Sequence, residues 1–369
     1  MEQSEVFSQQ CLHPSFRVFG VSYDYKRLKV YAYTLSQDTT TYLSDIGNFI
    51  LDWLSPKQDI QVTTSGSTGV PKQISIQKSQ MYESALATGH FFKLSTSTKA
   101  LLCLSSNYIA GKMMLVRAMV LGWDLHWVAP TASPLKGTDA MYSFVAMVPL
   151  QLQNSLQELF RVKKIIVGGG QVSQSLIKQL PSKETLVFET YGMTETVSHI
   201  AVRKLNHNEG DISYFEILPH IRIGVDDRSC LRITAPKLCD EVLQTNDIVD
   251  LKSVSSFEWK GRFDNVINSG GIKLFPEQIE RKLASTIQSR FFVSYQQDVL
   301  LGNKLILIIE TNALSSKGKE SLLLEIKELP SLSKYEVPKR IYTTPSFIET
   351  ATQKVKREAI RKEILGVND

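Results

Sequence analysis

The sequence is poor in cysteine and has no long apolar segment, and both absences exclude classes of protein. Its 369 residues include four cysteines, Cys11, Cys103, Cys230 and Cys239, and no two of them form a Cys-x-x-Cys pair. This spacing excludes the common zinc and dithiol motifs and indicates a reducing compartment. No apolar run approaches the roughly 20 residues of a membrane-spanning helix. The start, MEQSEVFSQQ, lacks the basic-then-apolar order of a signal peptide, so we expect a cytoplasmic protein.

The chain also has little excess charge of either sign. Its 42 basic and 37 acidic residues leave a net charge of +5, and they are spread along the sequence. Such a balance does not indicate a nucleic-acid partner. The length favours two domains rather than one.

Strand-like and helix-like segments alternate over the first part of the chain. Short apolar runs such as ALLCLSS, SFVAMVP and TLVFETYG predict strands, whereas GKMMLVRAMVLG, LQLQNSLQEL and QVSQSLIKQL predict helices. This alternation predicts parallel strands covered by helices, an α/β arrangement. Polar or glycine-rich stretches follow four of the strands: TTSGSTG, SSNYIAG, GGG and ETYGMTET. Because ligands bind at the carboxyl ends of such strands, we expect these stretches to form one site.

After about residue 212 the sequence becomes richer in short β-type runs, and beyond GRFDNVINSGG a smaller unit begins. Pro276 suits the first turn of a helix in that unit. We therefore predict a mixed α+β protein with a large N-terminal domain of layered sheets and helices, residues 1–263. A small C-terminal α+β domain follows, residues 264–369.

The stretch TTSGSTGVPKQ, residues 63–73, has three interpretations. A flexible linker is disfavoured because DIQVTT before it and KQISIQ after it both resemble strands. The phosphate loop of nucleoside triphosphatases requires Gly-Lys and then Ser or Thr at the start of a helix, and this sequence does not have that order. The third interpretation is a turn between strands, whose glycines, hydroxyls and Lys72 hold phosphates.

Five segments together resemble the adenylate-forming acyl- and aryl-CoA synthetases. TTSGSTGVPK is similar to the signature of that superfamily, and ETYGMTET to its adenine-and-magnesium motif. TND resembles its ribose motif, GRFDNVINSGGIKLFPEQIE its hinge, and TATQKVKREAIR the segment of its catalytic lysine. The segments occur in the family's order over nearly the whole chain. Relative to the family, the N-terminal domain is short.

The resemblance implies a two-step reaction with ATP, Mg²⁺ and coenzyme A as co-substrate. A carboxylic acid is first adenylated, with release of pyrophosphate, and the acyl group then passes to the thiol of coenzyme A. It also implies that Glu195 binds Mg²⁺ and that Thr194 touches the α-phosphate. The nucleotide would contact Thr64, Ser65, Gly66, Ser67, Thr68, Gly69, Lys72, Gly168, Gly169, Gly170, Tyr191, Gly192, Asp247 and Arg262.

The C-terminal domain would supply the catalytic lysine, for which we predict Lys354. Lys356 and Arg357 stay as alternatives, because Gln353 stands where the family usually has Gly. Asp264 resembles the hinge residue about which a mobile C-terminal domain rotates. One pose would present Lys354, and the other the turn Ser269, Gly270 and Gly271 to the coenzyme A channel.

The acid itself is indicated by SSNYIAGKMMLVRAMVLG, which is similar to a segment of the o-succinylbenzoate–CoA ligases of menaquinone synthesis. Tyr108 stands where those ligases have His, and Arg117 matches their Arg. With His199, these residues would form the acyl site and suit an acid with two carboxylates. Alternative functions are another aryl- or short-acyl-CoA synthetase, a carrier-loading adenylation domain and a non-catalytic nucleotide-binding relative. The sequence does not decide whether the protein forms a homodimer.

Overall fold

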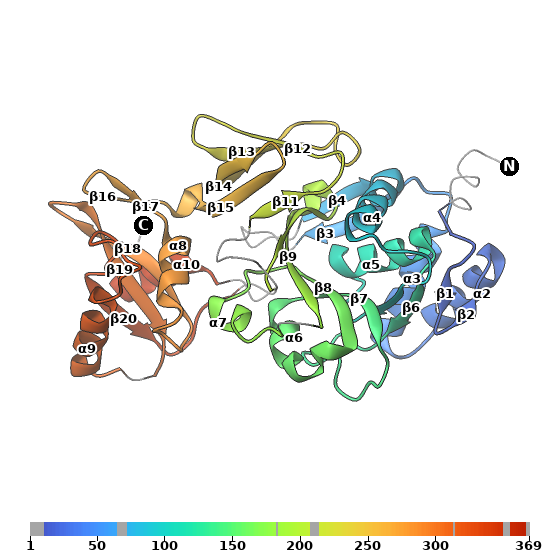
Figure 1. Ribbon diagram of the computed structural model, residues 1–369, viewed down its shortest axis with the longest axis horizontal. Coiled ribbons are helices and arrows are strands. Elements are labelled where there is room, and N and C mark those ends of the chain that lie inside the picture. Colours follow the sequence, from blue (N-terminus) through green and yellow to red (C-terminus); the bar gives the residue numbers. More distant parts are fainter. Residues whose placement is uncertain are drawn as a thin grey trace.

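A 13-stranded sheet forms the centre of this computed structural model, which describes residues 11–64, 72–181, 184–206, 214–312, 314–349 and 355–366. One part of the sheet is parallel. Its strands are, in spatial order, β1 (Arg17–Val18), β6 (Asp124–Trp127), β5 (Lys99–Leu102), β7 (Tyr142–Met147), β8 (Val162–Val167) and β9 (Leu186–Gly192). The ends of β5, β8 and β9 therefore lie at the same edge of the sheet, and Figure 1 shows β8 and β9 side by side. The fourth strand of the prediction, β3 (Asp59–Thr64), lies instead in a separate two-stranded sheet, so a single site formed by all four stretches stays a prediction.

Beyond β9 the sheet becomes antiparallel. The strands that follow in space are β10 (His199–Lys204), β11 (Phe215–Ile217), β15 (Ser256–Arg262), β14 (Leu243–Ser253), β13 (Cys230–Thr234) and β12 (Arg222–Val225). A short strand, β2 (Val21–Ser22), closes the other edge beside β1. Strand β9 is thus parallel to β8 on one side and antiparallel to β10 on the other, so it is the boundary between the parallel and antiparallel parts of the sheet.

Helices cover both faces of the parallel part. In β5, Ala100 and Leu102 belong to one buried cluster and Leu101 to another, because successive side chains of a strand point to opposite faces. The first cluster packs against α2 (Tyr25–Ser36), α3 (Thr41–Trp53), α4 (Lys78–Phe92) and α5 (Ile109–Leu121). The second packs against α6 (Pro149–Asn154), a 3₁₀ turn (Leu156–Arg161) and α7 (Gln174–Ile177).

Two predicted helices are shorter in the structure than in the sequence pattern. The pattern LQLQNSLQEL predicts one helix, but the chain leaves the helical conformation at Ser155 and continues as a 3₁₀ turn. The tighter turn keeps Leu152 and Leu159 in the same buried cluster. Similarly, QVSQSLIKQL forms only the single turn of α7. Both corrections reflect packing against the sheet, which overrides local periodicity.

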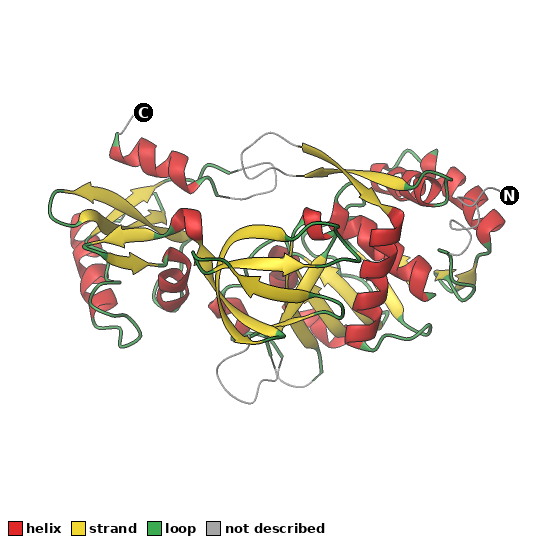
Figure 2. Ribbon diagram, turned by 90° about the horizontal axis from the view of Figure 1, so that it is seen from above, coloured by secondary structure: helices red, strands yellow, loops and turns green. Residues whose placement is uncertain are grey.

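Two antiparallel strands precede and follow the predicted phosphate loop, as expected. Strands β3 (Asp59–Thr64) and β4 (Lys72–Gln77) are antiparallel, and Thr64 pairs with Lys72. The segment after the loop is a strand and not a helix, so the interpretation as a nucleoside-triphosphatase loop is wrong. Residues 65–71 themselves lie outside the described residues. Figure 2 shows the hairpin extending away from the helices toward the side of the molecule that carries α10 (Arg357–Leu365).

The C-terminal part has its own sheets and its own buried clusters. The elements of this part are a 3₁₀ turn (Phe263–Asn265), β16 (Ile267–Ser269), β17 (Ile272–Leu274), α8 (Pro276–Leu283), β18 (Phe291–Asp298), β19 (Gly302–Glu310), α9 (Ser316–Lys327), β20 (Arg340–Thr344) and α10. Pro276 is the first residue of α8, as predicted. The central clusters end at Phe257 and the C-terminal ones begin at Ile267. The predicted boundary at 263–264 falls in this interval and stays a prediction.

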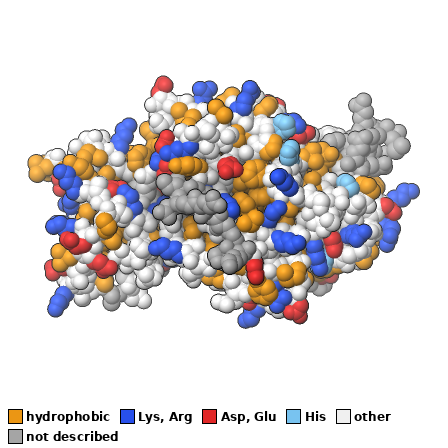
Figure 3. Space-filling model, viewed as in Figure 1, with side chains coloured by type: hydrophobic (Ala, Val, Ile, Leu, Met, Phe, Trp, Pro, Cys, Tyr) orange, Lys and Arg blue, Asp and Glu red, His pale blue; other side chains and the backbone are white. Residues whose placement is uncertain are grey.

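On the face drawn in Figure 3, Lys and Arg side chains are dispersed among acidic and apolar ones. Within the part of the chain that the structure describes, no helix is long and apolar enough to span a membrane.

Gly111, in the first turns of α5, packs so closely on the preceding loop that a side chain has no room. A Cβ atom there would lie 2.5 Å from the carbonyl carbon of Ser105. Alanine usually stabilises a helix by about 1 kcal/mol relative to glycine. We nevertheless expect Gly111→Ala to lower the free energy of unfolding by about 2 kcal/mol, because the overlap is with backbone. Urea unfolding measures this difference.

Gly318, in α9, provides the matched control. A Cβ atom there would first meet the side chain of Leu314, at 3.1 Å, which can move. We expect Gly318→Ala to change the free energy of unfolding by no more than about 1 kcal/mol. Equal losses in both variants would contradict the packing argument.

Candidate active site

The turn between β9 and β10 places four of the predicted nucleotide-site residues at the edge of the sheet. Tyr191 and Gly192 end β9, and a 3₁₀ turn (Thr194–Thr196) follows, with the carboxylate of Glu195 exposed. The buried hydroxyl of Thr196 fixes this turn: it accepts from the backbone N–H of Met193 at 3.0 Å, and its single hydrogen can be donated to the backbone oxygen of Met193 or of Ser198, at 2.9 and 2.8 Å.

Two backbone features show how tightly this turn is packed. A Cβ atom on Gly192 would lie 2.6 Å from the Cα of His199, so only glycine fits there. Val197 has a φ of 66°, a conformation that is strained for a β-branched residue. The turn therefore holds Ser198 and His199 in fixed positions directly after the predicted magnesium ligand.

The structure brings Tyr191 and Asp247 together. The Tyr191 hydroxyl donates to Oδ2 of Asp247 at 2.7 Å, and the indole Nε1 of Trp259 donates to Oδ1 at 3.0 Å. Asp247 is only 8% exposed. Burial, and then the Asp247 carboxylate, raise the pKa of Tyr191, so its hydroxyl stays a donor. A carboxylate that is fixed from two sides and keeps free lone pairs can accept both hydroxyls of a ribose.

Arg262 and Asp264 lie beside this carboxylate. Arg262 faces Asp247 across the β14–β15 pair, and its Nη2 donates to Oδ2 of Asp264 at 2.8 Å. Asn246 also donates to Asp264, with its Nδ2 at 3.3 Å from Oδ1.

The first of the three glycines after β8 packs on β9, and the other two lie beside Val148 and Pro149. Gly169 has a φ of 79°, which favours glycine, and a Cβ atom on Gly168 would lie 2.7 Å from Oγ1 of Thr190. At Gly168 the backbone therefore passes close to the strand that carries Tyr191, and the role of the glycines beside the base stays a prediction.

Arg117 and His199, both predicted for the acyl site, lie in one buried cluster. Arg117 is 1% exposed; its Nε donates to Oγ1 of Thr88 at 3.2 Å, and its Nη2 to Oγ of Ser198 at 2.6 Å. Nη2 is also 3.4 Å from Nδ1 of His199. Burial lowers the pKa of Arg117 to about 9. Within the described residues this guanidinium has only neutral partners and forms no ion pair. The carboxylate of a bound ligand would therefore neutralise its charge.

The same contact determines the tautomer of His199. A guanidinium only donates, so Nδ1 accepts and the neutral ring carries its proton on Nε2. Burial, and then the charge of Arg117, lower the pKa of His199 well below its usual value, which keeps the ring neutral. Its Nε2 is buried and has no partner in the described structure. The N–H at Nε2 of His199 is therefore a donor that a bound ligand could use, in addition to the charge of Arg117.

Tyr108 is not part of this cluster in the contacts that the structure shows. It precedes the first residue of α5 and is 51% exposed. Its predicted role in the acyl site stays a prediction.

The predicted catalytic lysine, Lys354, lies outside the described residues, as do Ser65, Gly66, Ser67, Thr68 and Gly69. The alternative Arg357 is engaged elsewhere: its Nη1 and Nη2 donate to the two carboxylate oxygens of Glu280 at 2.7 and 2.8 Å. The alternative Lys356 is exposed just before α10. The turn Ser269, Gly270 and Gly271 joins β16 and β17, and Gly270 N donates to the backbone oxygen of Leu301 at 2.8 Å.

A magnesium ion would have few protein ligands here. The described residues contain no group of three or more His, Cys, Asp or Glu side chains that could hold a metal. A single exposed carboxylate, Glu195, in the turn beside the nucleotide residues nevertheless fits Mg²⁺, which prefers one or two carboxylates together with phosphate oxygens.

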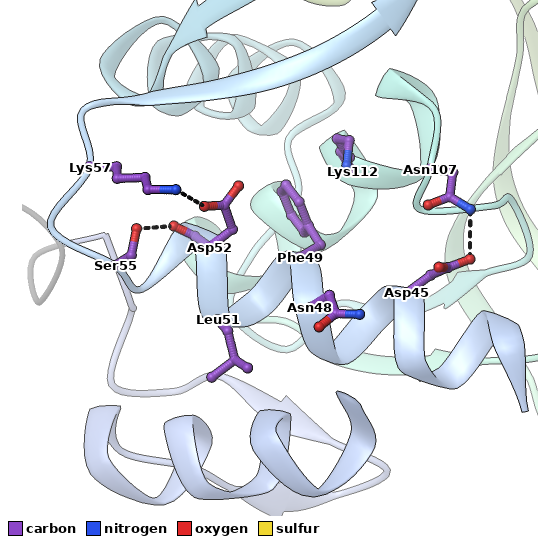
Figure 4. A pocket seen from close by; sticks show the side chains of 9 residues that line it. All are labelled: Asp45, Asn48, Phe49, Leu51, Asp52, Ser55, Lys57, Asn107 and Lys112. Atoms are coloured by element: carbon purple, nitrogen blue, oxygen red, sulfur yellow. Dashed lines mark hydrogen bonds and ion pairs between the residues drawn. The ribbon is translucent and has the colours of Figure 1, made fainter. Parts of the chain in front are cut away.

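A separate cavity of about 530 Å³ opens beside α3 and the start of α5 (Figure 4). Two pairs of its side chains face each other: Lys57 Nζ is 3.9 Å from Oδ1 of Asp52, and the neutral amide of Asn107 donates to Oδ2 of Asp45 at 2.7 Å. The residues that line this cavity include none of the predicted site residues. They are Asp45, Asn48, Phe49, Leu51, Asp52, Ser55, Lys57, Asn107 and Lys112.

Sequence reasoning missed three residues of these clusters. Trp259 could have been found from the β14–β15 hairpin, because a turn after Ser253 brings it near Asp247. Ser198 lies between the predicted Glu195 and His199 and carried a weak signal. Thr88 gave no signal, since only the packing of α4 on α5 brings it to Arg117.

The low pKa of His199 has a consequence for stability. The unfolded chain takes up a proton on this residue as the pH falls below about 6.5, whereas the folded chain does not, so folding loses free energy on acidification. Between pH 7 and 5.5 we expect wild-type protein to lose about 1 kcal/mol relative to His199→Gln. Urea unfolding of both proteins at the two pH values measures the change. A constant difference would contradict the buried neutral ring.

Comparison with known proteins agrees with the geometry. The model of a family described as AMP-binding enzyme matches residues 60–234. A solved structure from Dyadobacter fermentans, an acyl-CoA synthetase (AMP-forming)/AMP-acid ligase II-like protein, is 39% identical and covers 91% of this chain and 98% of that one, with a TM-score of 0.61. The o-succinylbenzoate CoA synthetase of Bacillus subtilis, in complex with its acyl-adenylate intermediate, has the same fold; it is 15% identical, with 98% of each chain covered and a TM-score of 0.76.

Curated relatives are more distant in sequence. The 2-succinylbenzoate–CoA ligases of Haemophilus influenzae and Enterococcus faecalis are both 25% identical, over 78% and 81% of this chain. The chain spans 66% and 68% of the length of these relatives. The family match, the 39% identical relative and the shared fold agree with the motifs, and the chain belongs to the AMP-binding enzymes, as an AMP-forming acid–CoA ligase of the acyl-CoA synthetase type.

Proposed function

We propose that this enzyme adenylates o-succinylbenzoate and transfers the acyl group to coenzyme A, the step of menaquinone biosynthesis that gives o-succinylbenzoyl-CoA. The observation that carries the proposal is the buried guanidinium of Arg117, which has only neutral partners in the described structure. A fatty acid would leave it unpaired, at a cost in free energy. An acid with a second carboxylate would pair with it while the first carboxylate reacts. The names of the 25% identical relatives support the same acid.

The nucleotide would bind along the edge where β8 and β9 end. Tyr191 and the glycines 168–170 would line the base, and Asp247 would accept the ribose hydroxyls. Thr194 would contact the α-phosphate, and Glu195 would hold Mg²⁺, which neutralises phosphate charge when bound. The loop from Thr64 to Gly69, with Lys72, would hold the β- and γ-phosphates.

In the first half-reaction a carboxylate oxygen of the acid attacks the α-phosphate, and pyrophosphate leaves. Lys354 would neutralise the charge that builds between these groups; its Nζ would contact both. The thiolate of coenzyme A then attacks the acyl carbon, and AMP leaves. Rotation about Asp264 would exchange Lys354 for the turn Ser269–Gly271 between the two steps.

ATP–pyrophosphate exchange against a panel of carboxylic acids tests the choice of acid. We expect exchange with o-succinylbenzoate and CoA-thioester formation when coenzyme A is added. Exchange only with benzoates or fatty acids would favour another CoA synthetase. Exchange without any transfer to coenzyme A would favour a carrier-loading domain, and no exchange with any acid a non-catalytic relative.

The role of Arg117 can be tested with a matched pair of acids. 4-Oxo-4-phenylbutanoate has the keto acid chain of o-succinylbenzoate but lacks the ring carboxylate. We expect Arg117→Met to raise the KM for o-succinylbenzoate roughly 10- to 100-fold, the value of a hydrogen bond to a charged group, and to change the KM for the analogue much less. Equal effects on both acids would show that Arg117 has only a structural role.

The role of Lys354 separates the two half-reactions. We expect Lys354→Ala to slow acyl-adenylate formation roughly 100- to 1000-fold and to leave thioester formation from supplied acyl-adenylate nearly unchanged. Both rates can be measured in single-turnover experiments. Lys356→Ala tests the neighbouring lysine: loss of adenylation in that variant instead would move the assignment, and equal loss of both steps would contradict the two-pose scheme.

A further inference from the structure

The Asp247 carboxylate is connected to the C-terminal part of the molecule through Trp259. The indole Nε1, the one polar atom of that side chain, donates to Oδ1 of Asp247 at 3.0 Å. On the indole ring lies the guanidinium of Arg281, with its Cζ 5.6 Å from the ring centroid. Nη2 of Arg281 also donates to the backbone oxygen of Trp259 at 3.3 Å.

This contact crosses the predicted hinge. Trp259 lies in β15, before Asp264, and Arg281 lies in α8, after it. Next to it, Gly261 has a φ of 152°, and a Cβ atom there would lie 2.5 Å from Oε2 of Glu277, so the start of α8 packs directly on β15. A rotation about Asp264 would move α8 and withdraw Arg281 from the indole.

We propose that Trp259 is a positioning residue for Asp247, and that Arg281 fixes Trp259 from the opposite side of the hinge. The proposal rests on the role of Asp247 as the ribose ligand, which belongs to the proposed function. Through these contacts the affinity of the ribose site depends on where the C-terminal part stands.

The physical basis is directional. An indole has a single N–H donor, so only one ring orientation directs it at Oδ1 of Asp247. Contact with a cation on one face favours that orientation. With Tyr191 at Oδ2 and Trp259 at Oδ1, the carboxylate keeps lone pairs that point toward the two ribose hydroxyls. By linkage, a nucleotide that prefers the fixed carboxylate also favours the pose in which Arg281 contacts the indole.

Equilibrium binding of AMP and 2′-deoxy-AMP tests the proposal without any acid substrate. Wild-type protein should prefer AMP. We expect Trp259→Phe, which keeps the ring and removes the donor, to lower this preference about tenfold. Arg281→Met should lower it about fivefold, and adding it to Trp259→Phe should have no further effect. Calorimetry or competition binding gives the ratio of the two dissociation constants, which partial unfolding would not change.

Three further variants make the result decisive. Arg281→Lys keeps a cation and should recover most of the preference. Lys334→Met is the matched control, because it removes a cation that lies over Tyr335 in the C-terminal part, away from β15, and should leave the ratio unchanged. Asp247→Asn should abolish the preference.

If Asp247→Asn leaves the preference intact, the ribose assignment in the proposed function is wrong. If Asp247→Asn abolishes it but Trp259→Phe or Arg281→Met does not change it, the ribose assignment stands and the present proposal is overturned.

Discussion

The site depends on the position of β9, which is hydrogen-bonded to a parallel strand on one side and an antiparallel strand on the other. The parallel side brings Gly168, directly after β8, against Thr190, the residue before Tyr191. The antiparallel side returns the chain at once through a tight turn, which places Ser198 and His199 beside Gly192. The residues proposed to bind nucleotide and the Arg117 cluster, which we propose binds the acid, therefore meet at the end of one strand.

Arginines in different parts of the protein differ in the groups that compensate their charge. Arg203, Arg357 and Arg361 are each paired with a carboxylate, those of Glu189, Glu280 and Glu358. These pairs offset the cost of removing a guanidinium from water within the protein itself. Arg117 is more deeply buried than these and has hydroxyl and imidazole partners instead. Such an arrangement stabilises the free protein less and favours a bound anion more.

Much of this could be predicted from the sequence, because the residues proposed to contact nucleotide occur in short motifs with fixed spacing. Tyr191, Gly192 and Glu195 lie within five consecutive positions, and the β14–β15 hairpin brings Asp247 beside Arg262. The contacts of Thr88 with Arg117 and of Arg281 with Trp259 could not be predicted, since each joins elements whose packing has no local sequence pattern. The break at Ser155 was missed for the same reason.

The shortness of the β9–β10 turn limits how such an enzyme can be redesigned. Glu195, Ser198 and His199 lie within five consecutive positions that include the strained Val197, so substitutions at 198 or 199 act on the turn that also carries Glu195. Thr88, on α4, contacts the same guanidinium from a separate helix. An engineer who wants a different acid without loss of catalytic rate should therefore vary the helix and leave the turn alone.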